Sequence, residues 1–149
     1  MNEATVISLK RTGCFGVCPS YELQIFGNGR VTYQGYGYVD VEGVQTTTIP
    51  GSSIYKLLYE FGKIDFFTLN DSYDQPITDI PTFTITLKIG GREKQVKHYG
   101  CPPQELIDLA YLIDEVTNSA QWIGQNAYTN RPKPICADYE WPQPYSPLR

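Results

Sequence analysis

Short stretches in which apolar and polar residues alternate, separated by glycine turns, are the feature of this sequence that most constrains its fold. Alternation runs through residues 5–11, 21–26 and 82–89, and a period of two is typical of strands that bury one face. GNG at 27–29 and GG at 90–91 follow two of these stretches and predict tight hairpins. We therefore expect an antiparallel meander at the start of the chain and a further hairpin later.

The third expected strand, RVTYQGYGYV at 30–39, carries glycines at 35 and 37 that interrupt the alternation. Such interruptions indicate a bend or a bulge. A turn at DVEG then leads into VQTTTI as the fourth strand, and REKQVKHY at 92–99 pairs with the strand before it across the GG turn.

Two segments change to a helical period. After PGSS, where Ser52 or Ser53 is the expected N-cap, apolar residues recur at helical spacing to about residue 64. After GCPP, a second helix is predicted by Leu106, Leu109, Ala110, Ile113 and Val116, with Trp122 packing just beyond its end. Residues 65–81 are expected to be a long connection. The order ββββαββα predicts an α+β domain, an antiparallel sheet with two helices packed on one face.

The length of 149 residues favours a single domain. We expect this α+β domain to span residues 1–124. Residues 125–149 hold five of the eleven prolines together with several aromatic residues, so they are expected to be an extended C-terminal tail.

Charge and hydropathy exclude some partners. The net charge is -4, and the 12 lysines and arginines are dispersed, which argues against nucleic-acid binding. No leader pattern and no apolar run of about 18 residues is visible. We therefore expect a cytoplasmic protein with no membrane span.

RTGCFGVCPSY at 11–21, which we call the cysteine loop, holds half of the four cysteines. This stretch, with TDIPTFTITLKIGG and KHYGCPP later in the chain, resembles a family of bacterial domains of unknown function with the signature R-x-G-C-F-G-x-C-P-x-Y. The similarity covers roughly Val6 to Gly124. The resemblance implies a compact domain with the cysteine loop as its shared feature. It implies no reaction, cofactor or ligand.

Two cysteine chemistries are compatible with this loop. Cys14, Cys18, His98 and Cys101 follow or end strands and would form a Cys3His zinc set if the strand ends converge, although the spacing is permitted rather than diagnostic. A Cys14–Cys18 disulfide would close a short, reducible loop suited to a redox switch, with Cys101 and Cys136 as a second bridge. We assign no cofactor on this basis, and zinc remains an alternative.

A third interpretation is structural, with both loop cysteines buried as small apolar side chains. In this case Arg11, which alternates with Ile7 and Leu9 on the covered face, pairs with a carboxylate such as Asp79 or caps loop carbonyls. Cys14, His98 and Asp79 also have the residue types of nucleophilic catalysis. Their order matches no hydrolase signature, so the sequence does not predict an enzyme.

Two clusters of other residues complete the candidates. Asp71, Asp74 and Asp79 lack the glycine and glutamate of a calcium loop and indicate turn chemistry. The tyrosines Tyr36 and Tyr38, beside Tyr33, and the aromatic residues of the tail, including Trp141, are residue types favoured in recognition surfaces. The sequence favours a non-enzymatic binding or protein-interaction domain that contacts a protein partner through this hairpin or the tail. A thiol-based redox or zinc protein using Cys14 and Cys18 is the alternative.

Overall fold

The fold is described from a computed structural model of the chain. The structure describes residues 4–12, 18–74, 82–99 and 102–130. The candidates that lie outside these ranges are Cys14, Asp79, Cys101, Cys136 and Trp141, together with the expected tail beyond residue 130.

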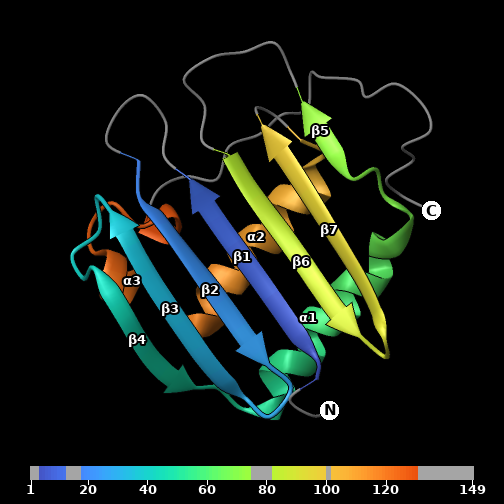
Figure 1. Cartoon of the computed structure of the whole chain (residues 1–149), viewed down its shortest axis with the longest axis horizontal. Coiled ribbons are helices and arrows are strands. Elements are labelled where there is room, and N and C mark those ends of the chain that lie inside the picture. The colour runs from blue at the N-terminus through green and yellow to red at the C-terminus, as the bar shows by residue number, and fades with distance from the viewer. Residues whose placement is uncertain (1–3, 13–17, 75–81, 100–101, 131–149) are drawn as a thin grey trace.

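In the described part of the chain, seven strands form one sheet in the order β4-β3-β2-β1-β6-β7-β5 (Figure 1). Their bounds are β1 (Val6–Thr12), β2 (Ser20–Phe26), β3 (Arg30–Gly37), β4 (Gly43–Thr48), β5 (Ser72–Asp74), β6 (Thr82–Ile89) and β7 (Arg92–Tyr99). Neighbouring strands are antiparallel except β5 and β7, which are parallel. The expected hairpins at 27–29 and 90–91 are confirmed.

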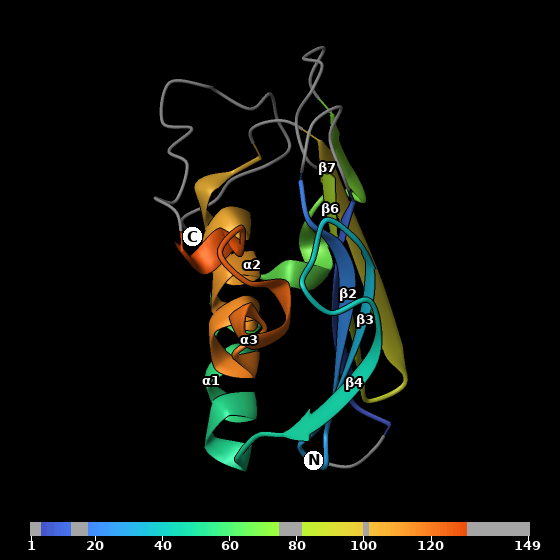
Figure 2. The ribbon, with the colours of Figure 1, turned by 90° about the vertical axis from the view of Figure 1, so that its left-hand side faces the viewer.

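The helices are gathered on one side of this sheet, as Figure 2 shows. They are α1 (Gly51–Lys63), α2 (Gln104–Thr117) and α3 (Ala120–Ile123), with the 3-10 turns η1 (Phe66–Thr68) and η2 (Tyr128–Asn130). We call this side the covered face. The open face is formed by the alternate strand residues that point away from the helices, among them Lys10, Gln24, Thr32, Gln34, Thr46, Thr84 and Lys97. The α+β class is thus confirmed. Within the described ranges no helix is long and apolar enough to cross a membrane.

The core lies between the covered face and the helices. Every second residue of β1 and β2 is buried, as the alternation predicts. From the helices, α1 contributes Ile54, Leu57 and Phe61, and α2 contributes Leu106, Leu109, Ala110 and Ile113. Burial of each large aliphatic side chain stabilises the fold by about 1.5–3 kcal/mol. The core continues past α3 to Ala127 and Tyr128.

A β-bulge confirms the irregularity expected from the glycines of β3. Ser20 lies opposite Gly37 and Tyr21 lies opposite Gly35, so Tyr36 is the extra residue on β3. Only glycine fits at position 35, because a Cβ there would overlap the carbonyl oxygen of Val41.

The connection between β3 and β4 is attached to α3. The backbone N–H of Val41 donates to the carbonyl of Trp122 (2.9 Å), and that of Asp40 donates to the carbonyl of Ile123 (3.2 Å). Beneath the connection, the ring of Tyr33 stacks on Trp122 with 4.9 Å between centroids. These contacts give the connection a defined shape.

Three expectations about local structure are wrong. Helix α1 begins after Pro50 and has no side-chain cap bond, so neither Ser52 nor Ser53 is the N-cap. The expected long connection contains β5, whose three residues pair with β7 and are too few to show a period. The described residues contain a third helix where two were expected: α3 starts after Asn118, which ends α2 with a left-handed φ of 53°. Trp122 lies in α3 and packs on Tyr33 just beyond the end of α2, as expected.

Candidate functional site

One row of side chains crosses the covered face at the end of the sheet where the cysteine loop begins. The strand register places side by side, in this order, Tyr21, Arg11, Phe83, His98 and Tyr73. All of these side chains are buried. The sequence placed Arg11 and His98 at two strand ends, and the register brings them into one row with Phe83 between them.

Arg11 forms a buried ion pair with Asp114 of α2. Its Nε and Nη2 atoms donate to Oδ2 of Asp114 at 3.0 and 2.9 Å, and the two side chains are only 3% and 1% exposed. The other carboxylate oxygen, Oδ1, accepts from the hydroxyls of Tyr21 (2.7 Å) and Ser119 (2.7 Å). Asp114 thus joins β1, β2 and the end of α2, and we call these four residues with Tyr128 the Arg11 cluster.

Aromatic rings surround the guanidinium of Arg11. Its Cζ lies 4.0 Å from the ring centroid of Tyr128, 5.3 Å from that of Tyr111 and 5.4 Å from that of Phe83. A cation held over ring faces in a desolvated site is stabilised by the ring quadrupoles, by up to about 2 kcal/mol. The rings therefore offset part of the cost of burying the charge.

Burial and charge determine the protonation states in the cluster. Burial lowers the pKa of Arg11, but attraction to Asp114 and the neighbouring phenols outweighs this effect and raises the pKa above its usual value. Burial, followed by the charge of Asp114, raises the pKa of Tyr21 well above its usual range. At neutral pH Arg11 is therefore charged and Tyr21 is a neutral hydrogen-bond donor.

The Arg11 cluster is suited to support the fold rather than to react. Asp114 accepts hydrogen bonds at both carboxylate oxygens, and Arg11 is enclosed by rings, so neither is presented to a substrate. The carboxylate that pairs with Arg11 is Asp114, whereas Asp79, the example expected from the sequence, lies outside the described residues. The sequence contains a signal that Asp114 is buried, because Asp114 lies four residues after Ala110 and therefore on the apolar face of α2.

His98 is 2% exposed, and neither ring nitrogen has a hydrogen-bond partner among the described residues. The ring packs edge-to-face against Phe83. Burial, followed by repulsion from Arg11, lowers the pKa of His98 well below its usual value. His98 is therefore neutral at pH 7.

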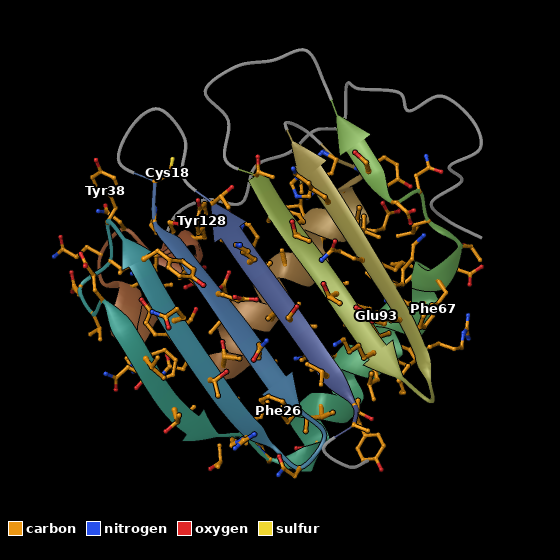
Figure 3. The ribbon with its side chains drawn as sticks, in the orientation of Figure 1. Cys18, Phe26, Tyr38, Phe67, Glu93 and Tyr128 are labelled. Atoms are coloured by element: carbon orange, nitrogen blue, oxygen red, sulfur yellow. The ribbon has the colours of Figure 1, made fainter. Side chains whose placement is uncertain are left out.

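Cys18, labelled in Figure 3, lies just before β2. It is disulfide-bonded. This bond contradicts the interpretation in which Cys18 is a free buried thiol. Cys14, Cys101 and Cys136 lie outside the described residues, so the Cys14–Cys18 pairing stays a prediction.

The proposed zinc set receives no support from the part of the chain that the structure covers. No group of three potential ligands occurs within those ranges. In the disulfide form the sulfur of Cys18 is not a thiolate, which is the species that binds zinc. The Cys14–His98–Asp79 constellation for catalysis includes two residues outside the described ranges and stays untested.

A second candidate site, which we call the hairpin patch, is formed by Tyr36 and Val44 on the open face and by Tyr38, the residue after β3. The side chains of Tyr36, Tyr38 and Val44 are 49%, 61% and 62% exposed. Tyr36 and Val44 border a depression of about 220 Å³ on β2, β3 and β4, which is also lined by polar side chains that include Glu22, Gln24 and Gln34. The hydroxyl of Tyr36 donates to Oε1 of Glu22 (3.3 Å). Burial, followed by the charge of Glu22, raises the pKa of Tyr36.

Tyr38 has a left-handed backbone with φ of 55°. This conformation is a strained one for a bulky residue and persists only where the surroundings impose it. Figure 3 shows Tyr38 and Cys18 at the same corner of the sheet. The register agrees, because Ser20 pairs with Gly37.

The tyrosines that the sequence grouped on this hairpin differ in exposure. Tyr33 is buried, and its hydroxyl donates to the carbonyl of Val41 (2.9 Å). Burial, followed by the charges of Asp40 and Glu42, raises the pKa of Tyr33 to about 12. Only Tyr36 and Tyr38 remain available for recognition.

Sequence reasoning did not single out Tyr55 and Tyr59, which are 65% and 69% exposed on α1. Their spacing of four residues is the signal that places them on one helix face. They lie on the helix layer, away from the open face.

Comparison with known proteins agrees with the resemblance seen in the sequence. No curated protein matches the chain. A family described as a domain of unknown function (DUF6438) matches residues 5–117. The match begins before β1 and ends with α2, so it includes Arg11, Tyr21 and Asp114. The chain therefore belongs to this family, the domain of unknown function DUF6438.

Proposed function

We propose that the protein is a non-enzymatic interaction domain that binds a protein partner through the hairpin patch. The observation that carries this proposal is the exposure of Tyr36, Tyr38 and Val44 at the corner of the sheet where β3 ends. Tyrosine is enriched in interfaces because it offers a large contact area and a polar edge. Its two χ angles limit the entropy lost on binding.

The patch is also preorganised. The β-bulge turns the chain at Tyr36, and the contacts of Asp40 and Val41 with α3 hold the connection that carries Tyr38. A surface that is already ordered loses less conformational entropy on association. The strained backbone of Tyr38 is a cost that a binding role would explain.

Charge around the patch indicates the chemistry of the partner. Glu22 lies in the patch and accepts a hydrogen bond from the hydroxyl of Tyr36. This carboxylate favours a partner that presents an apolar group beside Lys or Arg, because complementary charges speed association and suppress wrong partners.

Site-specific photo-crosslinking in the native host tests the proposal. A photoreactive phenylalanine analogue is placed at Tyr38 and, as a matched control, at Tyr59, an exposed tyrosine of α1. We expect a discrete protein adduct from position 38 that does not form from position 59. Equal adducts from both positions, or none from position 38, would contradict the proposal.

A thiol-based function is the second candidate, favoured by the disulfide bond of Cys18. A redox switch requires the bond to open and close at physiological potentials, whereas a structural disulfide resists reduction. Alkylation of the native protein after equilibration with glutathione buffers of increasing reducing strength tests this candidate. Opening of the bond within the range of cellular potentials supports it, and a bond that stays closed throughout rejects it.

The C-terminal tail stays a second predicted binding segment. Its aromatic residues, including Trp141, could serve the partner or the domain itself. Truncation after residue 130 distinguishes these roles: lost crosslinking at position 38 with unchanged thermal stability assigns the tail to the partner, and lost stability assigns it to the domain.

A further inference from the structure

The two edges of the sheet are built differently. The β5 edge is three residues long. Lys94 of β7 donates hydrogen bonds to the side chain of Asp71 (2.6 Å) and to the carbonyl of Leu69 (2.5 Å), in the segment that leads into β5. The β4 edge has six residues, GVQTTT, without proline or charge, and pairs with β3 without a bulge. Short strands, charges, prolines and bulges are the devices that protect sheet edges from pairing with other chains. Strand β4 has none of them.

The outward-facing backbone groups of β4 can be identified. The N–H of Ile49 donates to the carbonyl of Gly29, its opposite residue on the β3 side. In an antiparallel ladder, hydrogen-bonded pairs alternate with unbonded ones. Gly43, Gln45 and Thr47 therefore bond to β3, and the N–H and C=O groups that point away from the sheet belong to Val44, Thr46 and Thr48.

We propose that β4 pairs in antiparallel fashion with β4 of a second copy of this chain, about a two-fold axis at Thr46. Thr46 then lies opposite Thr46 of the second copy, and Val44 lies opposite its Thr48. Each hydrogen-bonded pair exchanges two bonds, so the three pairs would form about six. Every outward-facing group of β4 is used once, which makes the edge complementary to itself.

The side chains fit the same register. Facing threonines and a valine facing a threonine are favourable cross-strand pairs, and no like charges oppose each other within the strand. The register also places Glu42 opposite Pro50 of the second copy, beside the start of α1, which has no acidic residue in its first turn. A carboxylate is stabilised near a helix N-terminus.

The assembly would join the two sheets into one, with the open faces of both copies on the same side. This inference does not depend on the proposed function, because it rests on the backbone of β4. A contact formed by two short strands is smaller than a standard interface, so we expect a dissociation constant of about 10 µM to 1 mM.

A charge swap at the axis tests the proposal. Thr46→Lys and Thr46→Glu each place two like charges opposite one another in the dimer, and an equimolar mixture of the two variants places opposite charges there. Thr46→Val is the matched control, because it keeps the backbone and the shape. Sedimentation velocity of the full chain is measured up to about 1 mM, the weak end of specific affinities. Circular dichroism checks the fold.

We expect the parent chain and Thr46→Val to dimerise. Each charged variant alone should dissociate at least about tenfold more readily, a change of about 1.4 kcal/mol. Their mixture should recover the dimer, which a folding defect could not produce. A parent chain that stays monomeric, charged variants that dimerise like the parent, or a mixture without recovery would each overturn the proposal.

Discussion

Breaking the Arg11–Asp114 ion pair should cost more stability than any surface substitution. Arg11→Met leaves the carboxylate of Asp114, which is 1% exposed, without its cation. Removing one partner of a buried pair costs about 3–5 kcal/mol, a large part of the about 5–15 kcal/mol that stabilises a typical domain. For a chain of this size the melting temperature should fall by about 6–20 °C.

Asp114→Asn completes the test, because it removes the charge but keeps an oxygen that can accept from Tyr21 and Ser119. The double variant Arg11→Met/Asp114→Asn removes both charges together, so it should lose less stability than the two single losses added. We expect a coupling energy near the upper end of about 0.5–3 kcal/mol, the range for contacting residues.

Urea unfolding, followed by circular dichroism, measures all four proteins of this cycle. Glu60→Gln is the control, since it breaks the exposed pair with Lys63 and should not measurably change the unfolding midpoint. A loss of less than about 1 kcal/mol in Arg11→Met, well below the range for breaking a buried pair, would refute the supporting role of the pair. So would single losses that add within about 0.5 kcal/mol.

The pKa of His98 is lowered in the folded state, so the unfolded chain binds a proton at His98 first as the pH falls through about 6.5, and the free energy of unfolding should decrease by at most about 1.4 kcal/mol per pH unit below that point. In unfolding titrations from pH 7 to 5, His98→Phe should make this decrease less steep. An unchanged slope would show that His98 is not responsible. Gly35→Ala should destabilise the protein by about 1–3 kcal/mol, because the added Cβ would overlap the carbonyl oxygen of Val41. Gly37→Ala is the control and should be tolerated, because a Cβ at position 37 has no neighbouring atom within 4 Å. Equal melting temperatures for the two variants would refute the close approach at Gly35. Tyr38→Gly should keep or raise the melting temperature by relieving a strained φ while it weakens partner binding, and a clear loss of stability would show that the ring supports the fold.

Much of the fold was predictable because periodicity reports directly on burial. Alternation identified the longer strands, helical spacing identified α1 and α2, and the glycines of β3 identified the bulge at Tyr36. The short elements were not predictable, because β5 and α3 are held by pairing and packing rather than by a pattern of their own. The absence of a cap bond at α1 has a similar cause, since Pro50 sets the start of that helix.

The candidate site was predictable only in part. Alternation placed Arg11 on the covered face, but its partner Asp114 is 103 residues away along the chain, and only tertiary structure brings the two together. The same alternation, applied strictly, would have separated Tyr33 from Tyr36 and Tyr38. Residue composition could not separate these tyrosines, because it contains no information on which face of the strand a side chain occupies.

The most direct test of the account is the affinity of the partner captured at position 38, measured by isothermal titration against paired variants. Tyr36→Ser/Tyr38→Ser removes both rings of the hairpin patch, and Tyr55→Ser/Tyr59→Ser removes two equally exposed rings from α1. Because truncating an interface residue that carries binding energy costs at least about 1–2 kcal/mol, we predict that the first double variant binds at least about tenfold more weakly and that the second binds like the parent. Equal affinities for the parent and the hairpin variant would contradict the account.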